Sequence, residues 1–278
     1  MPVSAAARDA AYQGAPGAYS EVAARDLLGD SASLLPCPTL EDMFDAVRDG
    51  QARHAVVPVE NCLTGAVPNA YELLFAHELQ AIGETQVHIE HVLAAPPGAT
   101  LEGIRRVLSH PVALAQCRRF FAEHPRIEAV AAFDTAGAVE MVMRVGDRTS
   151  AALAARRTAA IYGADVIADT LQDHAENWTR FLLVAPAGRI DDSPGPRKAL
   201  VTFELPHTPG ALHHALEPLA AHGLNLTRIQ SQPVHGRPFE YRFLVEMTSE
   251  DGMTLEKGLE AMRMVTRGLK TFGNYHVG

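Results

Sequence analysis

The alternation of apolar and polar positions is most regular near the end of the chain. Phe239, Tyr241, Phe243, Val245 and Met247 alternate with mostly polar neighbours. Successive side chains of a β-strand point to opposite faces, so this pattern predicts a strand with one face in a core and the other in solvent.

The hydrophobic pattern predicts five more elements around this strand. They are strands at 200–205 and 226–234, helices at 209–223 and 253–266, and a last strand after the second helix. The order is therefore βαββαβ. This is the ferredoxin-like arrangement, in which one antiparallel sheet carries both helices on one face.

Earlier in the chain, short apolar stretches alternate with helical ones, which predicts an α/β fold. Pro, Gly, Asp and Ser gather at 185–198, between two apolar runs, and such a cluster indicates a domain boundary. We therefore expect a first domain at 10–186, a linker at 187–197 and a second domain at 198–278.

Composition narrows the classes of partner. The 278 residues carry a formal net charge of −9, and the scattered Lys and Arg form no basic stripe, so we expect no nucleic-acid partner. No apolar run approaches the roughly 20 residues of a membrane span, and the N-terminus lacks the apolar centre of a signal peptide. We expect a cytoplasmic protein without a membrane partner.

Cys37, Cys62 and Cys117 lie far apart, so we expect three reduced thiols.

The common catalytic and metal-binding motifs are absent from the sequence. No Walker loop, dinucleotide fingerprint or GxSxG elbow is found. His88 and His91 lie three apart in a strand-like segment and point to opposite faces, so we interpret them as core or edge residues. His213 and His214 are about 100° apart on a helix, which makes a poor chelate. The sequence therefore predicts no metal site.

Four predicted helices begin with small or polar residues that are plausible N-caps. These starts are Ser20, the stretch 65–68, Ser109, and Asp134 with Thr135. If several of them converge on one cleft, their backbone N–H groups and helix dipoles form a receptor for carboxylates. Taken one by one, they are ordinary caps.

Several segments, taken in order, resemble the prephenate dehydratase family from about Tyr12 to Pro186. They include VENCLTGAVPNAYELL, SHPVALAQC, DTAGAVEMV and DHAENWTRFLLVAP. The most specific signals are Ser109–Cys117 and the TRF triplet at Thr179–Phe181. The later segments PGAL and NLTRIQSQP resemble the ACT module, which binds phenylalanine in such enzymes.

The resemblance implies a fold and an activity. We expect two α/β lobes like those of a periplasmic binding protein, with the second lobe at about 86–168 and the substrate between the lobes. The implied reaction converts prephenate to phenylpyruvate with loss of carbon dioxide and water, and it needs neither cofactor nor metal. L-Phenylalanine is the implied allosteric effector, and the family implies a homodimer or homotetramer.

The resemblance also implies particular site residues. Thr179 is the expected catalytic donor to the leaving hydroxyl. The expected substrate contacts are Asn61, Ser109, Gln116, Thr135 and Arg180, with Arg180 on the side-chain carboxylate or in positioning. The expected phenylalanine site comprises Gly210, Ala211, Leu212, Asn225, Leu226, Gln230, Ser231, Gln232 and Pro233.

The sequence departs from the family pattern at three single residues and in one motif. Ala18, Cys62 and Val112 stand where relatives commonly have Thr, Ser and Gln, which changes the polar groups near the substrate. Gln230–Pro233 reads Gln-Ser-Gln-Pro in place of Glu-Ser-Arg-Pro, so both charges of that motif are missing.

Two alternatives stay open at this point. Arogenate dehydratase performs the same elimination on a substrate with an amine in place of the ketone. A catalytically silent protein that only senses amino acids would use the same two-lobed cleft and ACT module. The intact TRF triplet argues against the silent protein.

Overall fold

The computed structural model describes residues 6–188, 195–234, 237 and 240–277. The chain forms two compact units. The first consists of Met1–Leu73 with Thr85–Leu183, and the second of Leu74–Glu84 with Val184–Gly278. Among the described residues, no helix is both long enough and apolar enough to cross a membrane.

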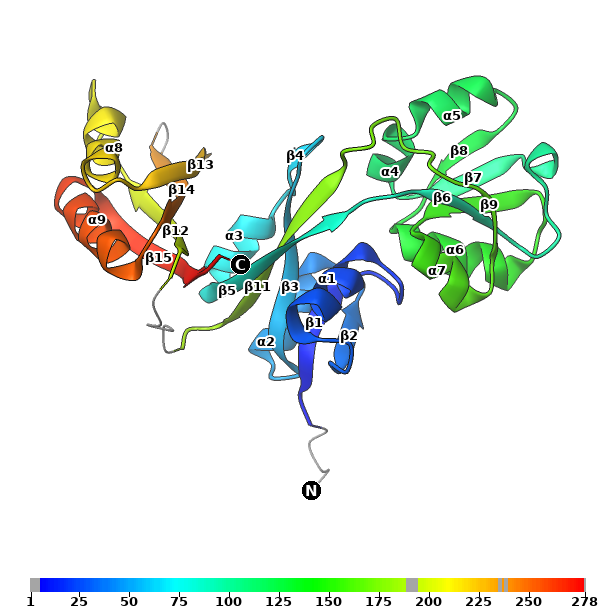
Figure 1. Ribbon diagram of the computed structural model, residues 1–278, viewed down its shortest axis with the longest axis horizontal. Coiled ribbons are helices and arrows are strands. Elements are labelled where there is room, and N and C mark those ends of the chain that lie inside the picture. Colours follow the sequence, from blue (N-terminus) through cyan, green and yellow to red (C-terminus); the bar gives the residue numbers. More distant parts are fainter. Residues whose placement is uncertain (1–5, 189–194, 235–236, 238–239, 278) are drawn as a thin grey trace. The chain divides into compact units, whose positions relative to one another are not determined.

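The first lobe of the first unit is built on a largely parallel sheet with strand order β11-β3-β1-β2 (Figure 1). Its strands are β1 (Arg8–Gln13), β2 (Leu34–Cys37), β3 (Ala52–Asn61) and β11 (Trp178–Pro186), with the short β4 (Gly65–Ala66) paired to β3. Its helices are α1 (Tyr19–Leu28) and α2 (Leu40–Arg48), followed by α3 (Ala70–Ala76). Helix α2 begins with a capping box between Thr39 and Asp42.

The second lobe has its own five-stranded sheet, in the order β10-β6-β9-β7-β8. Its strands are β6 (Val92–Ala95), β7 (Arg106–Ser109), β8 (Glu128–Ala131), β9 (Ser150–Ala154) and β10 (Asp165–Ala168). Its helices are η1 (Leu101–Gly103), α4 (Pro111–Ala115), α5 (Arg118–Glu123), α6 (Thr135–Val145) and α7 (Arg156–Tyr162). Alternate residues of the fully buried β9 enter two different core clusters, so this strand is covered on both faces.

Two crossings join the two lobes of the first unit. The chain enters the second lobe after β5 (Leu79–His88) and leaves it after β10. Strand β11, which contains Thr179–Phe181, then pairs within the sheet of the first lobe.

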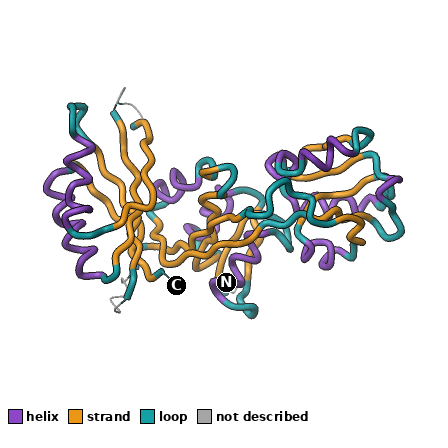
Figure 2. Tube along the Cα trace, turned by 45° about the horizontal axis from the view of Figure 1, so that its top comes forward, coloured by secondary structure: helices purple, strands orange, loops and turns teal. Residues whose placement is uncertain are grey.

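The second unit contains the predicted βαββαβ series. Its elements are β12 (Arg197–Glu204), α8 (Ala211–Ala221), β13 (Asn225–Pro233), β14 (Tyr241–Ser249), α9 (Gly252–Val265) and β15 (Arg267–His276). The antiparallel order is β13-β14-β12-β15, and both helices lie on one face (Figure 2). Phe239 of the predicted alternation, and 189–194 of the predicted linker, lie outside the described residues.

One segment of the second unit comes from far upstream, and no sequence signal pointed to it. Residues 74–84 pack with the C-terminal strands: Ala81 of β5 pairs with Gly273 of β15, and the rings of Phe75 and Phe272 lie 4.4 Å apart. Lys198 is 8% exposed, and its ammonium lies 2.6 Å from the carboxylate of Glu84. This partner explains how a charged lysine is buried within β12.

Candidate active site

A cavity of about 460 Å³ lies between the two lobes of the first unit. Residues at the starts of α1, α4 and α6 line the cavity. Val67 and Pro68, which precede α3, and Thr179 of β11 complete this part of the lining. The four predicted helix starts therefore do converge on one cavity. The positive ends of the two longer helices, α1 and α6, favour an anionic ligand there.

The capping residues themselves are only partly as predicted. Asp134 caps α6, because its carboxylate accepts a hydrogen bond from the N–H of Gly137 at 2.7 Å. The other caps were wrong: Ala18 rather than Ser20 precedes α1, and His110 rather than Ser109 precedes α4. Ser109 ends β7, and Ser20 lies inside the first turn of α1. Helix α3 begins only at Ala70, after the stretch 65–68.

Asn61 and Thr179 meet at the cavity from neighbouring strands. Asn61 is the last residue of β3, and its Nδ2 donates to the hydroxyl oxygen of Thr179 at 3.0 Å. The same amide donates to the carbonyl of Trp178 at 3.1 Å. An amide N–H cannot accept a hydrogen bond, so the hydroxyl proton of Thr179 points elsewhere. In the described residues that proton has no acceptor, which leaves it available to a ligand in the cavity.

Asn177 connects this pair to Gln116, and the sequence analysis missed it. Its side chain is fully buried, accepts from Asn61 Nδ2 at 2.8 Å and donates to Gln116 Oε1 at 3.1 Å. The only sequence signal is its place two residues before the TRF triplet. Gln116 lines the cavity, and its Nε2 group donates to no described residue. Thr179 and Gln116 therefore both offer hydrogen-bond donors to a ligand.

His91 completes this network. It is 1% exposed and lines the cavity, and its Nε2 lies 3.1 Å from Gln116 Oε1. Burial lowers the pKa of His91, against a smaller opposing effect of the bond to Gln116, so the ring is neutral near pH 7. The predicted core position of His91 is right, but that interpretation overlooked its place at the cavity.

The remaining predicted substrate contacts divide into one that lines the cavity and two that do not. Thr135, the first residue of α6, is at the cavity. Ser109 is fully buried and donates to the carbonyl of Leu153 at 2.7 Å, so it braces β7 against β9. Arg180 does not line the cavity, because adjacent strand residues point to opposite faces and Thr179 occupies the inner one.

Arg180 has partners of its own away from the cavity. Its guanidinium lies 3.3 Å from the Glu60 carboxylate and 3.3 Å from the Tyr71 hydroxyl. The side chain is 11% exposed, so this is a largely buried ion pair. Such a placement fits the expected positioning role better than a direct hold on the side-chain carboxylate.

Two of the three unusual residues lie at the cavity. Ala18 and Val112 line it and contribute methyl groups where relatives carry hydroxyl or amide groups. Cys62 is not among the lining residues. Its thiol donates to the carbonyl of Glu176 at 3.4 Å and accepts from the N–H of Trp178 at 3.1 Å, which anchors the start of β11.

The cavity lining among the described residues contains neither Lys nor Arg. An anionic ligand would be held there by neutral N–H and O–H donors and by helix N-termini. A cation held against a departing carboxylate stabilises the ground state and opposes decarboxylation. The arrangement therefore suits a substrate that must lose a carboxylate.

The residues expected to bind phenylalanine all lie in the second unit, at the start of α8 and on β13. Gly210 precedes α8 with φ +80°, a conformation that glycine adopts without strain. Ala211 and Leu212 line a small cavity of about 150 Å³ together with Tyr241 and Phe243. The other expected residues follow one another on the outer strand β13, where Gln230 and Gln232 are half-buried and Asn225, Ser231 and Pro233 are exposed.

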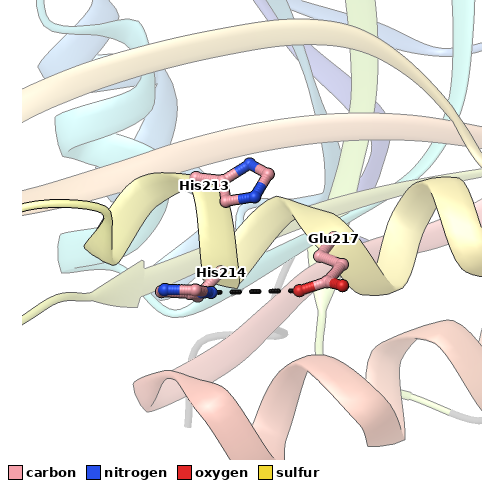
Figure 3. Close-up of side chains that lie close together, drawn as sticks. All are labelled: His213, His214 and Glu217. Atoms are coloured by element: carbon pink, nitrogen blue, oxygen red, sulfur yellow. Dashed lines mark ion pairs between the residues drawn. The ribbon is translucent and has the colours of Figure 1, made fainter.

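A cluster of possible metal ligands lies on α8. Potential ligand atoms of His213, His214 and Glu217 lie within 4.8 Å of one another (Figure 3). All three side chains are exposed, and they project from a single helical turn. No buried group among the described residues fixes their orientation, so the cluster is an ordinary solvated surface.

A comparison with protein-family models matches both parts of the chain. The prephenate dehydratase model matches residues 10–189. The chain belongs to the prephenate dehydratase family. An ACT domain model matches residues 199–257, from β12 into α9.

Relatives and solved structures agree with this assignment. The chain is 36% identical to "Arogenate dehydratase/prephenate dehydratase 6, chloroplastic" of Arabidopsis thaliana, over 95% of this chain and 68% of that one. A prephenate dehydratase from Arthrobacter aurescens, solved with L-Phe, is 31% identical with a TM-score of 0.85, covering 96% of this chain and 90% of that one.

A further relative has two named activities. It is the "Bifunctional N-acyl-homoserine lactone acylase/prephenate dehydratase" of Komagataeibacter europaeus, 34% identical over 95% of this chain and 94% of that one. A solved structure described as a quorum-quenching acylase has a TM-score of 0.88 at 34% identity and covers 98% of both chains.

Proposed function

We propose that this dehydratase converts prephenate to phenylpyruvate, carbon dioxide and water. One observation carries the proposal: Thr179 and Gln116 direct unused hydrogen-bond donors at a cavity whose described lining has no cationic side chain. Prephenate is a cyclohexadiene with a ring carboxylate and, opposite to it, a hydroxyl. Loss of both groups makes the ring aromatic.

The hydroxyl is the difficult leaving group, because it must depart with a proton or a strong hydrogen bond. The carbon–carboxylate bond breaks, its electron pair moves into the ring, and the carbon–oxygen bond of the hydroxyl breaks at the far side. Thr179 donates a hydrogen bond to that oxygen, and the departing hydroxide takes up a solvent proton, directly or by relay through the Thr179 hydroxyl, and leaves as water. Because Asn61 donates to the Thr179 oxygen, the O–H of Thr179 is polarised and becomes a better donor. Such acid assistance is typically worth about 10² to 10⁴ in rate.

The choice between prephenate and arogenate needs a direct assay. Purified protein is incubated separately with each compound, and phenylpyruvate and phenylalanine are quantified. We expect phenylpyruvate from prephenate at a higher kcat/KM than phenylalanine from arogenate. A higher kcat/KM with arogenate would make the chain an arogenate dehydratase. If neither compound gives a product, the remaining hypothesis is a catalytically silent protein that senses amino acids.

We also propose that L-phenylalanine is the effector and that the protein works as a homodimer or homotetramer. The ACT domain and the phenylalanine complex of the Arthrobacter aurescens relative support the effector. The outer strand β13 supports association, because an open strand edge favours pairing with another copy. Light scattering after size exclusion, with and without phenylalanine, tests both proposals.

Hydrolysis of N-acyl-homoserine lactones is a second candidate activity. It rests on the Komagataeibacter europaeus relative, which matches over nearly its whole length and so has no large additional domain to carry the acylase activity. The test is to incubate the protein with an acyl-homoserine lactone and to look for homoserine lactone and the free fatty acid. If neither product forms, the dehydratase proposal stands alone.

A further inference from the structure

His91 is a buried histidine with one ring nitrogen in use and the other idle. Its Nε2 contacts Gln116 Oε1 at 3.1 Å, whereas Nδ1 is buried and has no hydrogen-bond partner among the described residues. The ring is held firmly in place. The backbone N–H of His91 donates to Gln172 Oε1 at 3.0 Å, and the backbone carbonyl of His91 accepts from the N–H of Leu171. The Tyr19 ring contacts the imidazole edge-on, with the ring centroids 6.0 Å apart.

The direction of every hydrogen bond in the network follows from backbone groups. Asn61 Oδ1 accepts from the N–H groups of Leu63 and Thr64, at 3.0 and 3.1 Å. Asn61 Nδ2 donates to the carbonyl of Trp178. Backbone donors and acceptors cannot exchange roles, so the orientation of the Asn61 amide is fixed.

The fixed orientation of Asn61 passes along the chain of amides. Asn177 Oδ1 must accept from Asn61, so Asn177 Nδ2 must donate to Gln116 Oε1. Gln116 Oε1 is therefore an acceptor toward its second neighbour as well. It follows that His91 carries its proton on Nε2 and donates it to Gln116.

We propose that His91 is a positioning residue of the dehydratase site: as the neutral Nε2–H tautomer, it holds Gln116 with its oxygen turned inward and its NH₂ group free to donate to the substrate. The inference rests on the proposed function only for its kinetic consequence. Gln116 Oε1 receives two hydrogen bonds, from His91 and Asn177, and both oppose rotation of the amide. A rotated amide would present an acceptor oxygen to an anionic substrate and repel it.

The idle Nδ1 separates a positioning role from a purely structural one. A buried nitrogen without a hydrogen-bond partner destabilises the folded protein. An apolar side chain at position 91 would remove that cost, and Gln116 Oε1 would keep its bond from Asn177. A histidine retained only for stability would not keep a buried nitrogen without a partner. We therefore expect an apolar replacement of His91 to lower activity while stability stays the same or rises.

The kinetic test compares His91→Leu with His91→Gln. Leucine removes the Nε2–H donor, whereas the glutamine amide reaches about where the histidine Nε2 lies. We expect His91→Leu to lower kcat on prephenate by about tenfold to a hundredfold, with an unchanged or higher Tm, and His91→Gln to keep most of the activity. Wild-type kinetics for both variants, or a fall in kcat that follows a fall in Tm, would overturn the proposal.

The coupling to Gln116 is tested by a double mutant. Gln116→Met keeps the length of the side chain without its polar groups. If His91 acts through Gln116, the double mutant His91→Leu with Gln116→Met is no slower than Gln116→Met alone. Multiplied effects of the two changes would show that His91 acts by another route.

The tautomer is tested without any assay of activity. Nitrogen-15 NMR of the histidine ring distinguishes a protonated from an unprotonated nitrogen. We expect Nε2 protonated and Nδ1 unprotonated in the wild type, with the signal assigned by its loss in His91→Gln. An Nδ1–H tautomer would overturn the inference even in an active enzyme. If the protein has the expected tautomer but turns over neither prephenate nor arogenate, the proposed function is wrong and the hydrogen-bond assignment of His91 stands.

Discussion

Backbone N–H groups fix the orientation of the Asn61 amide, and that amide contacts Thr179 on β11. Its oxygen accepts from the N–H groups of Leu63 and Thr64, which leaves its NH₂ group for Asn177 and Thr179. The hydroxyl of Thr179 therefore accepts on one side and donates on the other. This one-way order gives a weakly acidic hydroxyl a defined direction in which to deliver its hydrogen bond.

The first prediction concerns Thr179. We expect Thr179→Ala to lower kcat on prephenate by about 10² or more with little loss of stability, because the half-buried hydroxyl is the useful group. Thr179→Ser keeps the hydroxyl and should retain a substantial part of the turnover. Thr179→Val, which matches threonine in shape, serves as the control for packing and should resemble the alanine variant. Near wild-type turnover by the alanine variant would remove Thr179 from the mechanism.

Glu21 is a buried carboxylate whose pKa bears on the acid stability of the first unit. It is 5% exposed, accepts from the N–H of Gly17 at 2.6 Å, and lies 2.7 Å from the Arg25 guanidinium. Burial alone raises its pKa, but the bonds from Gly17 and Arg25, with the charge of Arg157, outweigh burial. The pKa of Glu21 is therefore lowered in the folded protein.

The second prediction follows from that direction. Because the folded pKa lies below the unfolded value of about 4.3, the stabilising contribution is complete above that pH and is lost as the pH falls through the folded pKa. We expect Glu21→Gln to lower the free energy of unfolding at pH 7 by about 1 to 3 kcal/mol. In urea denaturation the gap to wild type should narrow only below about pH 4.3. Asp30→Asn, an exposed control, should change stability by less than about 0.5 kcal/mol.

The sequence predicted some site residues and missed others for identifiable reasons. Thr179, Asn61 and Gln116 stand inside motifs, and the structure brings them together. Asn177 and His91 take part through burial and distant partners, which no local pattern encodes. Strand alternation already separates Arg180 from Thr179, so the opposite placement of Arg180 was available from the sequence.

At the scale of elements, the ACT strands and helices were predictable because their periodicity is strong. Helix α9 runs over Gly252–Val265 where 253–266 was expected. The starts of α1 and α4 were harder to predict. Their first turns are set by Ala18 and by His110 followed by Pro111, whereas the small polar residues nearby face inward.

The third prediction concerns the outer strand β13. Gln230 and Gln232 lie on the same face, and both replace charged residues of the family motif. A charge-assisted hydrogen bond is worth about 1.5 to 3 kcal/mol where it forms. We expect phenylalanine to bind the natural chain more weakly than the double mutant Gln230→Glu with Gln232→Arg, as measured by titration calorimetry and inhibition curves.

The register of β13 supplies the control for that comparison. Gln232 lies opposite Arg242 of β14, so an arginine at position 232 faces a like charge, with a cost of about 0.2 to 1 kcal/mol. Gln230→Glu alone avoids this repulsion and separates ligand affinity from stability. Equal or tighter binding by the natural chain would contradict the prediction and would give the Gln-Ser-Gln-Pro motif its own mode of binding.

At the scale of the whole chain, the residues proposed for catalysis all precede Val184, where the second unit resumes. The second unit also includes residues 74–84, which pack against β12 and β15. The sequence suggested a boundary only at the Pro- and Gly-rich stretch. The contribution of 74–84 depends on tertiary contacts and has no signature in local composition.

The fourth prediction tests this division with a chain that ends at Pro186. We expect it to convert prephenate and to ignore phenylalanine, because the proposed catalytic residues all remain. We expect a lower Tm, because Phe75 loses Phe272 and Glu84 loses Lys198. Full-length Phe272→Ser removes only the first of these contacts and should give a smaller loss of Tm. A well-folded truncated chain without activity would show that the C-terminal domain contributes to the site.

The packing of residues 74–84 also limits how such enzymes can be recombined. An engineer who exchanges regulatory domains would naturally cut in the Pro- and Gly-rich stretch at 185–198. The graft would then set a foreign β15 beside the resident Ala81 and a foreign β12 beside the resident Glu84. A chimera that carries the donor's 74–84 segment along with its C-terminal domain keeps the native contacts of that segment with β12 and β15.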